Sequence, residues 1–113
     1  QEESHIDLVI AVSGSGPAYF FLVMEAMEQS AHEMGLPEEI VRLLVSQTAL
    51  GASRMAMESE KDVAQLRQAV TSPNGTTESA VRVLEAGHIR ELFANALSAA
   101  AKRSEELSQQ LRG

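Results

Sequence analysis

The sequence predicts a single all-α domain over residues 1–113, a bundle of about five helices. Two observations support this fold class. Apolar residues recur at helical spacing in long segments that contain no proline. Short groups of Gly and Pro that interrupt helices separate these segments, at Gly14–Pro17, Gly35–Pro37, Ser72–Gly75 and Ala86–Gly87. A length of 113 residues leaves no room for a second domain of ordinary size.

The N-terminal segment is the least clearly patterned part of the sequence. The chain begins with Gln1, and Gln1–Ser4 lacks the basic start and apolar centre of a signal peptide. We therefore expect the chain to be a piece of a longer protein. The apolar residues of Ile6–Val12 would suit a strand, but the chain offers no second strand to pair with it. We predict a short helical or extended lead-in there.

The first long helix is predicted over Pro17–Met34. Proline suits a first helical turn, and Gly35 stands where a C-terminal cap belongs. The first half of this helix is apolar on every side, so it must be covered on every side, and one short domain has little to cover it with. A partner chain is the simplest explanation, and we predict a homodimer.

Four more helices are predicted after this one. The segment Pro37–Glu60 shows a loose helical period, and the small residues in its middle would let another helix approach closely: Ala49, Gly51, Ala52 and Ser53. Shorter helices are predicted around Asp62–Ala69 and Thr76–Glu85. The last helix, His88–Leu111, needs a facing surface because it carries an apolar stripe: Ile89, Leu92, Phe93, Ala96, Ala100, Leu107 and Leu111.

Composition excludes several classes of partner. Nine Lys and Arg against 16 Asp and Glu give a net charge of −7, which disfavours nucleic acids and anionic membrane surfaces. The longest apolar run, Pro17–Met24, has about eight residues, whereas a membrane span needs roughly 20. The absence of Cys excludes disulfides and thiolate metal sites, and it is consistent with a reducing compartment. We predict a cytoplasmic protein that binds neither nucleic acid nor membrane.

Two patterns in the sequence only partly match known site motifs. Ser13–Gly16 lacks the third glycine of a dinucleotide-binding loop, because the chain has Tyr19 at that position. Glu85 and His88 have the spacing of a di-iron ligand pair, but Gly87 interrupts the helix between them and no second copy exists. We predict no cofactor-binding residue and no metal ligand in this chain.

The segment Thr71–Glu78 is the strongest candidate for a binding site. Asn74 tolerates the left-handed conformation and Gly75 has no Cβ, so the backbone can turn tightly before a helix begins. The free amides of Gly75, Thr76 and Thr77 would then converge near the positive end of the helix dipole. Three charge-assisted hydrogen bonds there would hold a small acid at about micromolar to millimolar affinity.

The same residues permit an ordinary structural interpretation. Ser, Asn and Thr are common helix caps, so Ser72, Asn74 or Thr76 would serve as a cap without any ligand. Glu78 argues against an anion, since its negative charge lies in the same first turn. The residues alone leave both interpretations open.

Two runs of the sequence closely resemble the signature of pyrroline-5-carboxylate reductases. They are LRQAVTSPNGTT (residues 66–77), continued by Val83–Glu85, and VSGSGPAY (residues 12–19). The segments Met34–Pro37 and Arg103–Leu107 extend the resemblance over nearly the whole chain.

The resemblance implies the C-terminal domain of a 6-phosphogluconate-dehydrogenase-like reductase, a helical bundle that forms an interlocked homodimer. Dimers of such enzymes assemble further in some cases. The Rossmann domain that binds NADP or NAD would precede this chain, so the isolated domain is predicted to be inactive. The implied reaction is the reduction of 1-pyrroline-5-carboxylate to L-proline by NAD(P)H.

The resemblance also implies roles for individual residues. The amides of Gly75, Thr76 and Thr77 would hold the substrate carboxylate, with Ser72 shaping the loop. The Thr77 hydroxyl would lie at the ring nitrogen as the candidate catalytic group, although a hydroxyl is a weak acid. Glu60 matches an acidic position near the site. The family usually has Gly where this chain has Asn74, and Asn also tolerates positive φ. The alternative function is a non-catalytic helical dimerisation module of a reductase-like protein.

Overall fold

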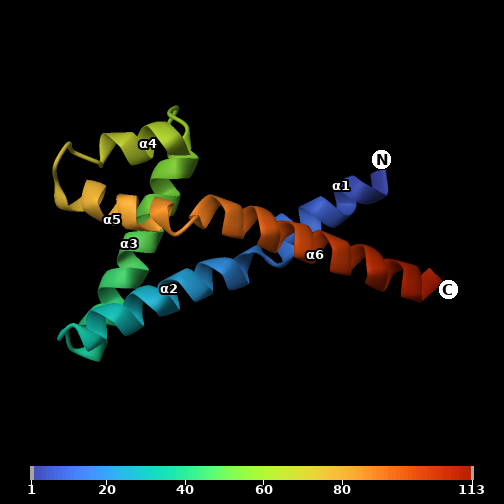
Figure 1. Ribbon diagram of the computed structural model, residues 1–113, viewed down its shortest axis with the longest axis horizontal. Helices are drawn as coiled ribbons and strands as arrows, with labels where there is room; N and C mark the ends of the chain where they lie inside the picture. The colour runs from blue at the N-terminus through green and yellow to red at the C-terminus, as the bar shows by residue number, and fades with distance from the viewer. Residues whose placement is uncertain (1, 113) are drawn as a thin grey trace. The chain divides into compact units, whose positions relative to one another are not determined.

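The computed structural model describes residues 2–112, and every regular element in that range is a helix (Figure 1). In chain order its elements are α1 (Glu2–Val9), the π-helical turn η1 (Ile10–Gly14), α2 (Gly16–Glu33), α3 (Glu38–Glu58), α4 (Val63–Ala69), α5 (Thr76–Ala86) and α6 (Ile89–Arg112). The all-α prediction is confirmed, and the ambiguous segment Ile6–Val12 is helical. Gln1 and Gly113, the ends of the predicted domain, lie outside the described residues.

The chain divides into two compact units. The first consists of residues 2–21 and 84–112, and the second of residues 22–83. The boundaries fall within α2 and α5, so each of these helices contributes to both units.

In the first unit, α6 packs against α1 and η1 (Figure 1). The π-helical turn is closed by the Ser15 amide, which donates to the Ile10 carbonyl oxygen five residues earlier at 2.9 Å. A wider turn of this kind leaves a carbonyl without its usual helical partner. The Tyr19 hydroxyl donates to the Ala11 carbonyl oxygen at 2.7 Å, and the Tyr19 ring meets Phe93 of α6 edge-on, with centroids 6.3 Å apart.

One buried carboxylate also joins the two ends of the first unit. Asp7 of α1 is only 7% exposed, and its Oδ1 accepts a hydrogen bond of 2.8 Å from the Ser104 hydroxyl of α6. A buried carboxylate needs such a donor because burial removes its contact with water.

The helix ends of the second unit follow the residues that the sequence analysis singled out. Gly35 has φ +121°, and its amide donates to His32 while the Leu36 amide donates to Ala31, which is the pattern of a Schellman cap. Helix α4 begins with a capping box, in which Asp62 accepts from the Gln65 amide and the Gln65 side chain accepts from the Asp62 amide.

The buried core of the described chain is small. Its buried apolar residues are Ala11 in the first unit, and Val41 and Val45 of α3 in the second. Helix α3 contacts α4, and an apolar groove of about 350 Å³ lies between them, lined by Ala52, Met55, Ala56, Val63, Leu66, Arg67 and Val70. At Gly51, an added Cβ would meet no atom within 4 Å. The space beside Gly51 is therefore open in the described chain, whereas Ala52 faces the groove toward α4.

Candidate functional site

The loop between α4 and α5 is built around a tight turn. The Gly75 amide donates to the Ser72 carbonyl oxygen at 3.1 Å, and Asn74 has φ +63°. A turn with Pro at its second position and a positive φ at its third has the features of type II, and Pro73 and Asn74 fill these places. The Thr71 hydroxyl donates back to the Arg67 carbonyl oxygen and secures the entrance of the loop on α4.

Gly75 is needed here because the turn is tight rather than because its own φ is positive. An added Cβ would lie 3.2 Å from the Ser72 carbonyl oxygen and 3.6 Å from the Ser72 Cβ. A Cβ at 3.2 Å from a backbone oxygen forces that oxygen to move by a few tenths of an ångström. Any larger residue at position 75 would therefore disturb the hydrogen bond that closes the turn.

The amides at the start of α5 differ in their availability. The expectation that the Gly75 amide is free is wrong, since that amide closes the turn. Neither the amide nor the hydroxyl of Thr76 or Thr77 donates a hydrogen bond to any other described residue. The first turn of α5 therefore presents two adjacent amides and two threonine hydroxyls, which are the groups that bind an anion at a helix N-terminus.

The loop is tied to α5 by Glu78, which the sequence analysis treated only as an unfavourable charge. Its Oε1 accepts a hydrogen bond of 3.0 Å from the Asn74 amide and lies 3.4 Å from the Arg82 guanidinium one turn later. The Glu78 side chain is 30% exposed. Its negative charge is thus partly offset by Arg82 and is directed at the turn.

Conventional capping by the loop's own polar side chains is not seen. Within residues 2–112, the side chains of Ser72, Asn74 and Thr76 make no hydrogen bond to the first turn of α5. Glu78, at the third helical position, instead accepts a hydrogen bond from the amide of Asn74, which lies before the helix. The sequence signal for Glu78 was therefore its spacing from the loop rather than its charge.

Glu60 lies in the exposed segment that connects α3 to α4. Its neighbours in this connection make local bonds, with the Lys61 amide donating to the Ser59 hydroxyl oxygen at 3.0 Å. Among the described residues, no hydrogen bond or ion pair joins Glu60 to the loop at residues 71–77.

The residues of the partial motifs are engaged in structural roles. Glu85 forms a two-pronged ion pair with Arg90 at 2.7–2.9 Å, and the hydrogen bonds that Arg90 donates to this carboxylate raise the pKa of Arg90 above its usual value. His88 has φ +63°, so His88, rather than Gly87, takes the left-handed position between α5 and α6. In the described part of the chain, no three His, Cys, Asp or Glu side chains form a group that would hold a metal ion.

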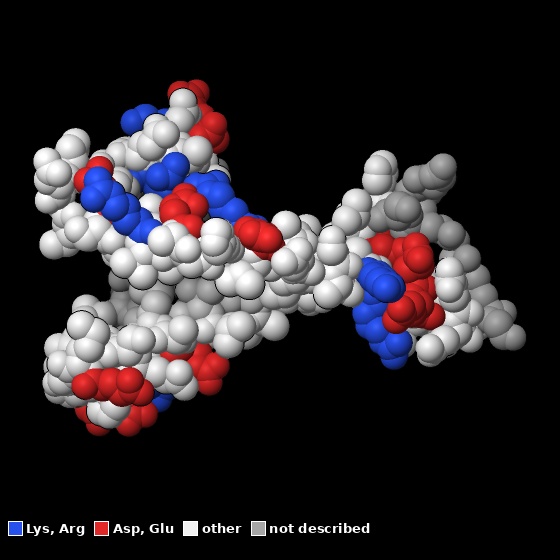
Figure 2. Space-filling model, viewed as in Figure 1, with Lys and Arg blue, Asp and Glu red and all other residues white. Residues whose placement is uncertain are grey.

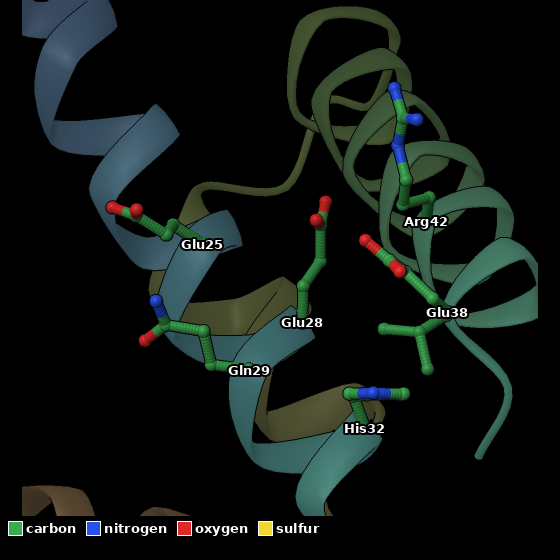
Figure 3. Close-up of a pocket in the computed structure, with 7 residues that line it drawn as sticks. Glu25, Glu28, Gln29, His32, Glu38 and Arg42 are labelled. Carbon is green, nitrogen blue, oxygen red and sulfur yellow. The ribbon is translucent and has the colours of Figure 1, made fainter.

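Acidic side chains gather over the turn between α2 and α3 in the second unit (Figure 2). A cavity of about 280 Å³ opens there, lined by Glu25, Glu28, Gln29, His32, Glu38, Val41 and Arg42. Glu28 and Glu38 point into the space between the helices, whereas Glu25 points away from α3 (Figure 3). The His32 ring nitrogen is hydrogen-bonded to the Leu36 carbonyl oxygen at 2.9 Å, so it serves the helix end.

The exposed apolar residues form a second functional surface. Phe20, Phe21 and Leu22 of α2 are 65–69% exposed. The chain exposes 9,154 Å², whereas a folded monomer of 12.2 kDa exposes about 6,100 Å². A dimer that buried an excess of about 3,000 Å² on each protomer would bury about 6,000 Å² in total, which is at the upper end of the range for obligate interfaces.

The helical run His5–Glu33 has 29 residues, and its most apolar 18-residue window has a mean hydropathy of 1.6, so the run is long and apolar enough to cross a membrane. The sequence-based prediction against a membrane span considered only the uninterrupted apolar stretch Pro17–Met24, which is shorter than this helical run. Membrane-spanning helices share this length and composition with helices that a second protein chain covers. Comparison with known proteins favours the second case.

Residues 3–107 match the family described as pyrroline-5-carboxylate reductase dimerisation. The chain belongs to this family. The exposed apolar surface of α2 is therefore that of a dimerisation domain, and the resemblance noted in the sequence is confirmed.

Individual relatives agree with the family assignment. The chain is 53% identical over 110 residues to pyrroline-5-carboxylate reductase of Pseudomonas aeruginosa, covering 97% of this chain and 40% of the relative. It is 48% identical over 108 residues to pyrroline-5-carboxylate reductase of Arabidopsis thaliana, covering 96% of this chain and 39% of that protein. The dimerisation domain thus spans about two fifths of the length of these reductases.

Solved structures show the same fold. A pyrroline-5-carboxylate reductase from Coxiella burnetii matches 95% of this chain and 40% of its own with a TM-score of 0.90 and 56% identity. The pyrroline carboxylate reductase of Plasmodium falciparum, solved with NADP bound, matches 91% of this chain and 39% of its own with a TM-score of 0.87 and 33% identity.

Proposed function

We propose that this chain is the dimerising and substrate-binding part of a cytoplasmic reductase that converts 1-pyrroline-5-carboxylate to L-proline with NAD(P)H. The family match and the relatives named above support this activity. The observation that carries the chain's own part in it is the pair of unengaged amides at Thr76 and Thr77, presented by a preformed turn.

The substrate's carboxylate is the group that this turn suits. The amides of Thr76 and Thr77 would each donate a hydrogen bond to it, and the positive end of the α5 dipole would add to the attraction. Gly75 and Ser72 act in our proposal by holding the turn closed, through the bond between the Gly75 amide and the Ser72 carbonyl oxygen. The Glu78 charge does not prevent this role, since Arg82 lies beside it.

We propose that the Thr77 hydroxyl lies at the ring nitrogen of the bound substrate. There it would accept or donate a hydrogen bond that orients the C=N bond and help a proton reach the nitrogen as the bond is reduced. A hydroxyl has too high a pKa to be an efficient acid alone, so the proton would pass through it from water. Glu60 is proposed as an acidic residue near the same site.

The cofactor would be held outside this chain. Residues 2–112 include no strand, and Gly14 and Gly16 flank the end of a π-helical turn instead of linking a strand to a helix. These residues do not fit the pyrophosphate of a dinucleotide, which needs a glycine-rich turn between those two elements. We therefore propose that a separate domain binds NADP or NAD and that the present chain alone is inactive.

We further propose a homodimer as the functional unit, in which the two copies interlock through their apolar helices. The dimerisation family and the excess exposed surface both support this assembly. We also propose that such dimers can associate into a larger oligomer.

The experiment that tests the proposed site compares Thr77→Ala and Thr77→Ser in the reductase that carries this domain. If the hydroxyl orients the substrate, Thr77→Ala lowers kcat/KM by about 10- to 1,000-fold, or about 1.4 to 4 kcal/mol, and Thr77→Ser keeps most of the activity. If Thr77 serves only the helix end, both variants keep wild-type kinetics, and Thr77→Ala loses about 1 kcal/mol of stability. A wild-type protein without reductase activity would instead favour a non-catalytic dimerisation module.

A further inference from the structure

Glu78 makes two bonds that have no part in the proposed chemistry. Its Oε1 accepts a hydrogen bond of 3.0 Å from the Asn74 amide and lies 3.4 Å from the Arg82 guanidinium. The side chain is 30% exposed, so it lies partly against the loop rather than free in water. We call the pair of Asn74 and Glu78 the loop clip.

The turn needs such a clip because Asn74 is not a glycine. At φ +63°, a residue with a Cβ occupies a region that is unfavourable for L-amino acids, although Asn tolerates it better than most. The Asn74 amide belongs to the strained residue itself, and Glu78 is fixed on the first turn of α5. The bond between them therefore favours the turned conformation over the extended alternatives.

We infer that Glu78 is a positioning residue for the carboxylate-binding amides of Thr76 and Thr77, acting through the Asn74 amide. This inference rests on the proposed function and adds a residue to it. When only a fraction of the molecules has the turn formed, the apparent affinity for substrate is the intrinsic affinity multiplied by that fraction. The amides bind the substrate carboxylate equally in the ground and transition states, so weakening the clip raises KM and leaves kcat nearly unchanged.

The test measures KM and kcat for 1-pyrroline-5-carboxylate in the full-length reductase. Glu78→Ala is expected to raise KM by about 5- to 10-fold with kcat within about twofold of wild type. Glu78→Gln keeps an acceptor oxygen without the charge and is expected to stay within about twofold of the wild-type KM. Glu106→Ala is the matched control, because Glu106 forms a comparable surface pair with Arg103 at 3.2 Å and belongs to a different helix, α6.

A double variant identifies the route of the effect. Glycine adopts positive φ without strain, so Asn74→Gly removes the need for the clip. Adding Glu78→Ala to Asn74→Gly is expected to raise KM by less than about twofold relative to Asn74→Gly alone. The double variant and Glu78→Gln also carry the test if Glu78→Ala fails to fold.

Three results would overturn the inference: an unchanged KM in Glu78→Ala, an equal rise in Glu78→Gln, or no rescue by Asn74→Gly. Hydrogen exchange of the peptide covering residues 70–78 gives a readout without substrate, and Glu78→Ala is expected to accelerate it about fivefold. If only the proposed function is wrong, Glu78→Ala still accelerates hydrogen exchange. If only the inference about Glu78 is wrong, Thr77→Ala still lowers kcat/KM.

Discussion

Substitution of Phe20 provides a direct test of the dimer, because the same substitution has a small free-energy cost in a monomer and a large one in a dimer. The side chain is 69% exposed within the chain, so Phe20→Asp would cost a monomer less than about 1 kcal/mol. In a dimer that covers α2, the same change removes an apolar burial of about 1.5 to 3 kcal/mol and places a carboxylate against an apolar surface.

Twofold symmetry introduces the substitution twice into each interface. We therefore expect Phe20→Asp to weaken dimerisation by at least about 1,000-fold, which is about 4 kcal/mol. Sedimentation equilibrium of the 113-residue chain measures this change directly. The wild-type melting temperature should also rise with protein concentration, since dimer formation stabilises the folded chain.

Gln47→Asp is the matched control, because it introduces the same carboxylate at an exposed polar position of α3. It should change the dimer dissociation constant far less than Phe20→Asp does. A wild-type chain that is a stable monomer at micromolar concentration, with a melting temperature independent of concentration, would contradict the proposed dimer. Equal association of the Phe20→Asp and wild-type chains would refute it as well.

Three further outcomes are expected. Gly75→Ala should lower kcat/KM of the reductase by about 3- to 30-fold, because its Cβ would displace the Ser72 carbonyl oxygen; unchanged kinetics would show that the turn is not part of the site. His88→Val should lower the free energy of unfolding by about 1 to 2 kcal/mol, since a β-branched residue strongly disfavours φ +63°, while His88→Gly should not. Calorimetry of the isolated chain should detect no NADPH binding, and saturable binding tighter than about 100 μM, about −5.5 kcal/mol, would overturn the placement of the cofactor.

The helices were predictable because their ends depend on local residues. Every predicted helix is present with ends within about two residues, since Pro, Gly and capping side chains act on the turn that contains them. The Schellman cap at Gly35 and the Asp62 capping box are examples. The need for a partner chain was also predictable, because an entirely apolar helix has to be covered.

Features that depend on distant residues or on a choice between neighbours were not predictable. The π-helical turn at Ile10–Gly14 is supported by Tyr19 and, through it, by Phe93 of a helix some 70 residues later. The left-handed residue after α5 is His88, although the neighbouring Gly87 would adopt that conformation at a lower free-energy cost. At the site, the sequence indicated the loop, but it did not indicate which amide would form the hydrogen bond that closes the turn.

The stability of the fold and the geometry of the site have different origins in this domain. The helices have few buried apolar residues of their own and leave large ones exposed, so their stability depends on association. The loop, in contrast, is held by bonds that all lie within residues 67–78: Thr71 to Arg67, Gly75 to Ser72 and Asn74 to Glu78. Local bonds of this kind form as soon as α4 and α5 are in place. Substitutions in the apolar surface should therefore change how much dimer exists, whereas substitutions in the loop should change what each dimer binds.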